Sequence, residues 1–415
     1  MALVPVTTDF TTAGFAANLA ANTMTWVLAG VERISTATAG AANAVGASAC
    51  GLRVDGTIGG ELGGVRMLGS ATAFNHLLIV GQGGLVFANL GPGASIGGAN
   101  ATVVNQGSIA AQFDGVSTNG AGSHIQNYGS ILSTFAGTGS NFGIAATGGG
   151  ALIENFGIIS SSAQAGAGIN LAALAVPLGS RVENHGTIIG FAKSVGGSSG
   201  DDTLINTGTL VGTADLGNGN DLFDGTGGAG TSFWGVKGGA GNDTLRGGSE
   251  ADLLNGDAGN DLLQGRDGVD SLNGGDGDDK VCGMGGSDTV SGGNGNDRLL
   301  GFNDDDTLDG GAGADVCSGG QGSDTFLFLS VSDIGVLANA RDSIADFNSG
   351  ADQIDLSAIG GLTFIKGAAF SNVAGQVRFV AATGELQIDT TGDAKADAVI
   401  DLVAVTALVA RDLIL

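Results

Sequence analysis

Charged, aromatic and proline residues are scarce in this chain of 415 residues. Only 13% of the residues are charged, and there are three prolines, two tryptophans and one tyrosine. No run of 18 apolar residues occurs, so no membrane-spanning helix is expected. The first 20 residues lack the basic region and compact apolar core of a Sec signal. The sequence therefore predicts either a cytosolic protein or one exported by a signal elsewhere in the chain.

Cysteine and histidine are too few for the common metal and protease motifs. Cys50, Cys282 and Cys317 form no CxxC pair, so neither a zinc site nor a disulfide framework is indicated. The three histidines stand at positions 76, 124 and 185 and form no HExxH motif, which excludes a zinc protease of that type.

Glycine and acidic residues are abundant instead. The chain has 80 glycines and a net charge of −26, and the acidity is concentrated: residues 201–324 hold 23 acidic and five basic residues, whereas residues 1–200 hold seven and five. This balance argues against nucleic acids and anionic membranes as partners and favours bound cations.

A loose repeat runs through residues 40–212. Stretches such as VVNQGSI, IQNYGSI and IENFGII place β-branched residues beside an Asn-x-Gly turn. A period of 20 to 30 residues predicts a parallel β-helix of about six to eight rungs, with a cap formed by roughly the first 35 residues. The repeated asparagines predict a side-chain ladder and are Asn105, Asn127, Asn155, Asn184 and Asn206.

A strict nine-residue repeat follows from Gly238 through ten units without insertion, as in GGAGNDTLR. One apolar residue per unit predicts a short strand with a single inward side chain, at Leu245, Leu254, Leu263, Leu272, Val281, Val290, Leu299, Leu308, Cys317 and Phe326. Cys282 is expected outside this core. The sixth position of each unit is an aspartate, namely Asp243, Asp252, Asp261, Asp270, Asp279, Asp288, Asp297, Asp306, Asp315 and Asp324. Two earlier, degenerate units place Asp202 and Asp221 in the same position.

Two units make one coil of 18 residues, so alternate aspartates stack one rung apart. At about 4.8 Å, like charges repel by roughly 1 kcal/mol per pair in water and by about 3 to 4 kcal/mol at an effective dielectric constant of 20. Ca²⁺ removes this conflict, because it takes six to eight oxygen ligands and glycine-rich turns offer backbone carbonyls beside the carboxylate. We therefore predict multiple calcium ions, with the twelve aspartates above as ligands.

These units resemble the GGxGxDxUx nonapeptide of RTX proteins, whose β-roll binds calcium between turns. Three of the units depart from it, at Glu250, at Met284, and at Phe302 with Asp304, and weaker binding is expected there. The stretch DSIADFNSGADQIDLSAI resembles the segment after the roll in serralysin-type proteins, and the tail VARDLIL is similar to an uncleaved type I secretion signal. The resemblance implies export in one step and folding that depends on extracellular calcium.

The predicted fold class is all-β: a right-handed parallel β-helix that continues into a calcium-binding RTX β-roll. We expect the β-helix with its N-terminal cap over residues 1–200, a transition over 201–237, the β-roll over 238–327, and a β-rich segment with the secretion signal over 328–415. The loop DTTGDAKAD at 389–397 is a further candidate calcium site, although it lacks the glycine and terminal glutamate of an EF-hand.

The favoured function is a secreted, calcium-dependent structural protein that self-assembles at the cell surface as a surface layer, matrix fibre or adhesin. Its expected partners are copies of itself, with cell-surface polysaccharide as a further candidate. The alternative is a polysaccharide-modifying enzyme, a mannuronan epimerase or lyase-like β-helix with an RTX module. Its candidate residues are His124, Tyr128, Glu154, Glu183 and His185, but their equivalent slots on successive rungs favour a surface ladder, so no catalytic residue is predicted.

Overall fold

The computed structural model divides the chain into two compact units, residues 1–237 and 238–415. It describes residues 76–134, 140–171, 178–226, 235–337 and 339–415, together with strands β1 to β8 and the adjoining Asp55 and Gly64. Almost all regular structure in these residues is β-strand, and the single helical element described is a 3₁₀ turn, η1 (Ala410–Asp412). The two units are taken separately below.

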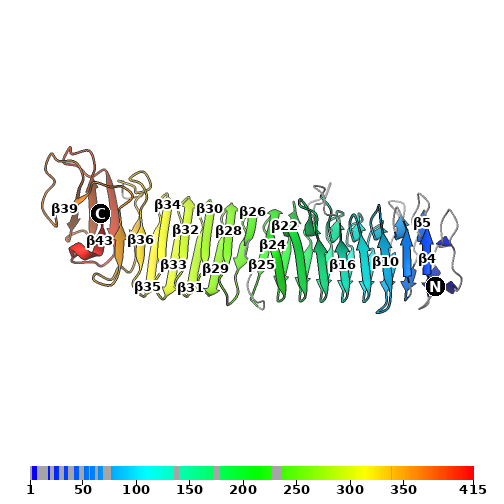
Figure 1. Ribbon diagram of the computed structural model, residues 1–415. Coiled ribbons are helices and arrows are strands. Elements are labelled where there is room, and N and C mark those ends of the chain that lie inside the picture. The colour runs from blue at the N-terminus through cyan, green and yellow to red at the C-terminus, as the bar shows by residue number, and fades with distance from the viewer. Residues whose placement is uncertain are drawn as a thin grey trace. The chain divides into compact units, whose positions relative to one another are not determined.

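The first unit consists of coils that each contribute up to three short strands, and strands of successive coils pair in parallel (Figure 1). The first series contains β1 (Ala2–Val6), β3 (Thr23–Val27), β6 (Gly51–Val54), β9 (Leu77–Val80), β12 (Thr102–Asn105), β15 (His124–Asn127), β18 (Leu152–Asn155), β21 (Arg181–Asn184), β23 (Thr203–Asn206) and β25 (Leu222–Asp224). The second contains β4 (Glu32–Ser35), β7 (Thr57–Gly60), β10 (Leu85–Ala88), β13 (Ser108–Ala111), β16 (Ser130–Ser133), β19 (Ile158–Ser161), β22 (Thr187–Ser198) and β24 (Thr209–Asn218). The third contains β2 (Ala17–Asn18), β5 (Ala42–Val45), β8 (Val65–Leu68), β11 (Ala94–Ile96), β14 (Val116–Thr118), β17 (Ile144–Ala146) and β20 (Ala167–Asn170).

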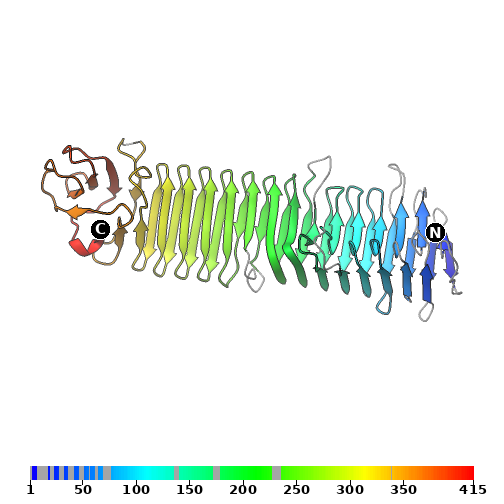
Figure 2. The same cartoon turned by 45° about the horizontal axis from the view of Figure 1, so that its top comes forward.

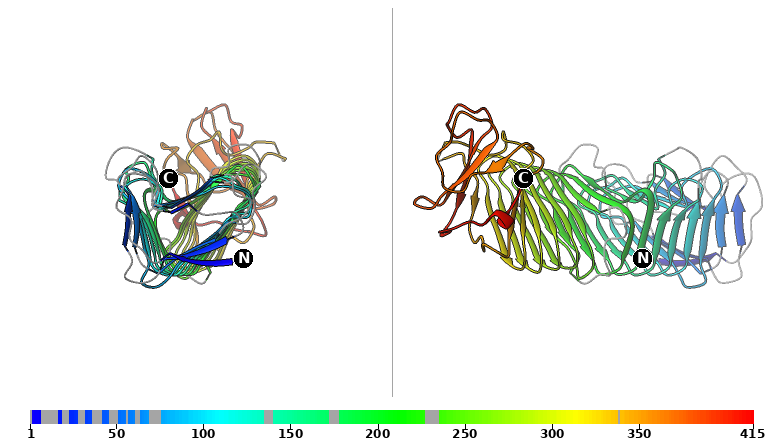
Figure 3. Two further views of the ribbon diagram at one scale, coloured as in Figure 1. Left: turned by 90° about the vertical axis from the view of Figure 1, so that its right-hand side faces the viewer. Right: turned by 60° about the vertical axis from the view of Figure 1, so that its left-hand side comes forward.

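Most strands from β9 onward turn one or two apolar side chains inward, because side chains alternate between the faces of a strand. In the first series Val103, Ile125, Ile153 and Val182 stack on successive coils, and none of them is exposed. Full burial of one such side chain contributes about 1.5 to 3 kcal/mol. The end-on view in Figure 3 (left) shows the N-terminal coils enclosing this common interior.

The predicted asparagine ladder is present where the first strand of each coil ends. The Nδ2 of each asparagine donates to the Oδ1 of the next, at 2.7 to 2.8 Å from Asn105 through Asn206. Because an amide side chain carries both donors and an acceptor, the buried stack satisfies itself without any ion.

The coil changes from three sides to two at β22. Residues 187–190 of this long strand pair with β19, whereas 193–196 pair with β20. The next strand of this side, β24, pairs along both parts of β22 with irregular register at residues 189–195. The second and third sides have therefore merged into one bent side before the nonapeptides begin.

The second unit begins inside β26 (Val236–Ala240) and forms two-sided coils of 18 residues, which Figure 2 shows as a regular stack. One side contains β27 (Thr244–Arg246), β29 (Leu262–Asp267), β31 (Lys280–Gly285), β33 (Arg298–Asn303) and β35 (Val316–Gln321). The other contains β28 (Leu253–Ala258), β30 (Ser271–Asp276), β32 (Thr289–Asn294), β34 (Thr307–Ala312) and β36 (Thr325–Leu327).

The C-terminal segment adds strands to both sides of this roll. On the first side β37 (Ser343–Ile344) pairs with β35, and β42 (Ala398–Leu402) pairs in parallel with β37. On the second side β38 (Gln353–Asp355) pairs with β36, and β43 (Leu413–Ile414) pairs with β38. The strands β39 (Thr363–Phe364), β40 (Gln376–Val380) and β41 (Glu385–Asp389) extend the sheet from β42, with antiparallel pairing between β40, β41 and β42.

The all-β solenoid class and the ten inward residues of the nonapeptides are confirmed, since each of the ten is at most 4% exposed. The expectation for Cys282 was wrong: it is 4% exposed, because the flanking Gln264 and Leu300 pair with it on β29 and β33 and cover this small side chain. Most of the proposed N-terminal cap lies outside the described residues, and the strands described there, β1 to β4, pair as parts of coils. The four predicted domain ranges stay a prediction.

Candidate calcium-binding site

The sixth-position aspartates form two buried rows at the turns of the second unit. From Asp243 to Asp306, the backbone N–H of each aspartate donates to the Oδ1 of the aspartate 18 residues later, at distances of 2.7 to 3.0 Å. The nine-residue period thus fixes the carboxylates in register on successive coils.

The second carboxylate oxygen of these aspartates, Oδ2, does not take part in these hydrogen-bonded rows. In most of these aspartates Oδ2 is buried and has no hydrogen-bond partner among the described residues, and the side chains are at most 3% exposed. The residues with this property are Asp261, Asp270, Asp279, Asp288, Asp297, Asp306, Asp315, Asp324 and, beyond the repeats, Asp342. A buried polar atom without a partner is costly, so each of these oxygens requires a proton or a cation.

The first glycine of each unit makes room for that oxygen. A Cβ atom added to Gly274 would lie 2.3 Å from Oδ2 of Asp279 and 2.6 Å from the carbonyl oxygen of Gly292 on the next coil. The same pair of oxygens converges at Gly256 and Gly301. An acidic oxygen and a backbone carbonyl therefore face one small space, where a side chain larger than hydrogen does not fit.

The second and fourth glycines serve the turn itself. Gly275 and Gly277 have φ angles of +119° and +133°, which side chains with a Cβ rarely adopt. At the departures from the consensus, Met284, Phe302 and Asp304 hold φ angles of +89°, +81° and +71°. The period therefore overrides the local preference of these residues and keeps the turn shape.

The raised pKa values of the buried aspartates are consistent with a missing positive charge beside them. Burial is the largest cause that raises the pKa of the stacked aspartates, neighbouring carboxylates raise it further, and the N–H bond from the preceding coil opposes both. The pKa is raised to about 7 for Asp270, Asp279 and Asp306 and to about 6 for Asp288, Asp297, Asp315 and Asp324.

This donor set fits calcium. All available ligands are oxygens, which a hard cation such as Ca²⁺ prefers. Within the described residues, no three His, Cys, Asp or Glu side chains gather as a metal-binding group. A cation between the turns would accordingly take much of its coordination from backbone carbonyls such as that of Gly292.

Two predicted ligands, Asp202 and Asp221, belong to the first unit, and Asp202 is bonded more fully. Oδ1 of Asp202 accepts from the backbone N–H of Ser180 at 2.5 Å, and its Oδ2 accepts from the N–H of Ser198 at 2.6 Å. The N–H of Asp202 donates in turn to Oδ1 of Asp221 at 2.6 Å. Asp252, in the nonapeptide that carries Glu250, likewise accepts a hydrogen bond from the backbone N–H of Gly248 with its Oδ2 at 2.6 Å.

Sequence reasoning missed the continuation of the rows into the C-terminal segment. Asp342 and Asp352 occupy the next two places, and each accepts the backbone N–H of the preceding aspartate in its row. The signal was present as Asp-Ser-Ile and Asp-Gln-Ile, an aspartate two residues before an inward apolar residue. It was hidden because the spacing grows from 18 residues to 27 and 28.

The loop at 389–397 holds its carboxylates with its own backbone. Asp389 accepts from the N–H groups of Gly392 and Ala394, and Asp397 accepts from the N–H groups of Thr390 and Thr391. These bonds are those of a tight turn between β41 and β42, so the loop needs no ion to close.

The candidate sugar-site residues lie along the outside of the first unit. Tyr128, Phe156 and His185 stack with ring centroids 4.9 Å apart. His124 contacts Glu154 at 2.6 Å, and this hydrogen bond lowers the pKa of Glu154, while Arg181 pairs with Glu183 at 2.6 Å. Each carboxylate is therefore paired, and the rings cover each other's faces.

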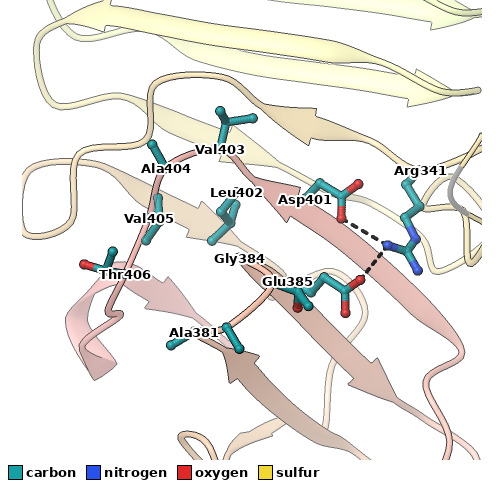
Figure 4. Close-up of a pocket in the computed structure, with 12 residues that line it drawn as sticks. Arg341, Ala381, Gly384, Glu385, Asp401, Leu402, Val403, Ala404, Val405 and Thr406 are labelled. Atoms are coloured by element: carbon teal, nitrogen blue, oxygen red, sulfur yellow. Dashed lines mark hydrogen bonds and ion pairs between the residues drawn. The ribbon is translucent and has the colours of Figure 1, made fainter.

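A hollow of about 560 Å³ lies in the C-terminal segment, lined by residues 381–385 at the turn from β40 to β41 and by residues 401–406 at and after the end of β42 (Figure 4). Arg341 bridges Glu385 at 2.7 Å and Asp401 at 3.2 Å on its wall. This ion pair ties the segment together and leaves both carboxylates compensated.

These features define the second unit as a calcium-binding β-solenoid. Residues 236–263 and 255–290 match the RTX calcium-binding nonapeptide repeat, and residues 274–415 match the Peptidase M10 serralysin C terminal family. The RTX and serralysin-like resemblance is thereby confirmed, and RTX nonapeptide repeats bind multiple Ca²⁺ ions. The two matches indicate a type I secreted, extracellular protein.

The other comparisons add little. No curated protein matches the sequence. Of the solved structures, one similar chain is the AlgE6R3 subunit of the Azotobacter vinelandii mannuronan C5-epimerase in solution, 25% identical over 42% of this chain and 78% of that one, with a TM-score of 0.21. Among the described residues, no helix has the length and apolar character that crossing a bilayer requires.

Proposed function

We propose that the stacked aspartates of the nonapeptides are the calcium ligands and that the ions lock successive coils together. The observation that carries this proposal is the row of buried Oδ2 atoms without hydrogen-bond partners, several of which, as at Asp261, Asp279 and Asp306, face a backbone carbonyl across a glycine. We include Asp202, Asp221, Asp243 and Asp252 in the proposed set as well. Asp202 and Asp221 are joined by a bond of the same kind, and Asp243 and Asp252 begin the two rows of the second unit.

A pair of variants tests this assignment. Asp279→Asn keeps an oxygen for the N–H of Asp261 but removes the charge, so calcium affinity at that turn is expected to fall at least tenfold in isothermal titration. Asp278→Asn is the matched control, because the neighbouring Asp278 is exposed and accepts only from Asn296. Equal affinity in the two variants would refute the assignment.

We also propose that the protein is a secreted structural component that assembles at the cell surface, as a layer, fibre or adhesin. The surface of the first unit supports this role. Phe191 is 68% and Val211 37% exposed, and together with Ile189 and Ser160 they line a shallow, mostly apolar hollow of about 440 Å³. Exposed apolar surface of this kind is typical of protein contacts.

Assembly is tested by electron microscopy and light scattering of the full chain with calcium and with EGTA. Ordered sheets or fibres that require calcium would support the role. Phe191→Ser should weaken them, whereas Thr207→Ser, also on the outside of the first unit, should not. Monodisperse protein at all calcium concentrations would contradict the proposal.

No observation favours the enzyme alternative over this role. Sugar rings dock on the open faces of aromatic side chains, whereas the faces of Phe156 lie against Tyr128 and His185. A direct assay nevertheless separates the two: turnover of alginate or pectin that is lost in Glu154→Gln would establish the enzyme.

A further inference from the structure

The hydrogen-bonded rows of aspartates extend past the last nonapeptide in unchanged register. The N–H of Asp315 donates to Oδ1 of Asp342 at 3.0 Å, and the N–H of Ser343 returns to the carbonyl of Asp315 at 2.8 Å. Within the repeats, Asp297 makes the same two bonds with the coil of Asp315. The C-terminal segment thus supplies the next member of the row although its own turn is not glycine-rich.

Asp342 and Asp352 differ in their second oxygen. Oδ2 of Asp352 accepts the backbone N–H of Asn348 at 2.7 Å, so both of its oxygens are bonded. Oδ2 of Asp342 has no hydrogen-bond partner among the described residues, and the side chain is only 2% exposed. In this respect Asp342 matches the aspartates of the nonapeptides and Asp352 does not.

The nearest basic residue in the chain does not supply the missing positive charge. Arg341 directs its guanidinium to Glu385, Asp401 and the carbonyl of Val336. The charges that act on Asp342 are acidic, from Asp315, Asp333 and Asp309. A buried carboxylate in such surroundings needs a cation or a proton.

We propose that Asp342 completes a further calcium site with the turn of residues 310–315, so that the last ion of this row joins the nonapeptide array to the C-terminal segment. The proposal rests on the calcium coordination put forward for the nonapeptides. Oδ2 of Asp315 and Oδ2 of Asp342, both buried and without partners, are its acidic ligands.

The site would make the folding of the C-terminal segment depend on calcium. The strand after Asp342 is β37, whose partner on the far side is β42. The N–H of Asp401 donates to the carbonyl of Asp342 itself at 2.9 Å. An ion held by Asp342 would therefore order β37 first and, through it, the antiparallel sheet of β40 to β42.

The test compares Asp342→Asn with Asp352→Asn in the full chain. Asparagine keeps an oxygen for the N–H of Asp315 but removes the charge. We expect native mass spectrometry to count one fewer Ca²⁺ in Asp342→Asn and an unchanged number in Asp352→Asn. In hydrogen exchange, calcium should no longer protect residues 343–344 and 398–402 of Asp342→Asn, while β29 and β31 respond as in the wild type.

An unchanged ion count and unchanged calcium-dependent protection in Asp342→Asn would overturn the inference, and Asp342 would then be a buried neutral acid. Should Asp342→Asn fail to fold, the wild type gives the answer. Protection of Ser343 and Ile344 must rise at the same calcium concentration as that of β35, and protection without calcium refutes the site. A wild type that binds no calcium at all would instead refute the coordination of the nonapeptides.

Discussion

The two units stack their coils with similar side chains, which carry an amide in the first unit and a carboxylate in the second. Both stack a short polar residue at the corner of successive coils, asparagine from Asn105 to Asn206 in the first unit and aspartate in the second. The asparagine amide donates to the next rung and satisfies the stack, whereas the carboxylate can only accept. We therefore expect the first unit to fold without an ion and the second to require one. The charges agree, with a net charge of −6 in residues 1–237 and −20 in residues 238–415.

Removal of calcium should produce the largest difference in stability between the two units. In EGTA at pH 8, amide protection of β29 to β35 is expected to collapse, because eight neighbouring carboxylate pairs each repel by about 1 to 4 kcal/mol. Protection of β12 to β23 should remain, because the asparagine ladder needs no ion. Hydrogen exchange with mass spectrometry measures both in one sample. Equal loss in the two units would show that the ladders are not the source of the difference.

Acid should partly replace calcium in the second unit. The pKa values of seven stacked aspartates, among them Asp270, Asp288 and Asp306, are raised to about 6 or 7 in the folded state, above the ordinary value of about 3.9. Protons therefore stabilise the folded form, fully below about pH 4 and progressively less as pH rises through 6 to 7. In EGTA, the urea midpoint of this unit should rise as pH falls from 8 to 5. A midpoint that is flat or falls would contradict the raised pKa values.

Exchanging the two side chains tests the comparison directly. Asn155 is fully buried, and its Nδ2 donates to Oδ1 of Asn184 at 2.8 Å and to the carbonyl of Thr187 at 3.2 Å. Asn155→Asp loses both donors and buries a charge, so the first unit should lose about 3 kcal/mol in urea unfolding. The reciprocal Asp279→Asn should raise the calcium-free stability of the second unit, because it removes one buried acid. Two losses of equal size would indicate simple packing damage.

The next largest effect is expected from substitution of the first glycine of a nonapeptide. Gly274→Ala would place a methyl group 2.3 Å from Oδ2 of Asp279 and should cost roughly 2 kcal/mol and weaken calcium binding. Gly285→Ala is the control, because its nearest atom is Oδ1 of the exposed Asp267 at 3.2 Å. Calorimetry in calcium compares their unfolding. If both variants unfolded at the same temperature, the close approach would have no energetic meaning.

The sequence was most informative where the period was strict. Ten inward residues and ten aspartates followed from counting in nines, and the asparagines from a looser period, because a solenoid converts sequence spacing directly into position. The merging of two sides at β22 was not predictable, since it arises from pairing with both β19 and β20.

Asp342 was missed for a related reason. The chain between Asp324 and Asp352 leaves the period, and only the pairing of β37 with β35 returns Asp342 to the row. Local sequence specified the Asp-x-Ile motif, but its place in the stack depends on contacts with residues 27 positions earlier in the chain.

The smallest effect expected concerns the turns that depart from the consensus. Phe302 holds a φ angle of +81° at a second-glycine position, is 45% exposed and pairs in register with Met284. Phe302→Gly should relieve the left-handed strain and stabilise the second unit by about 1 kcal/mol, less whatever contact with Met284 is lost. Phe302→Ala keeps the strain and loses the same contact, so it should give no gain. Calorimetry in saturating calcium compares the stability of the two variants. An equal gain in stability in Phe302→Ala and Phe302→Gly would assign the effect to loss of the exposed ring. No gain in Phe302→Gly would mean that the fixed period, not the glycine, carries the stability of the turn.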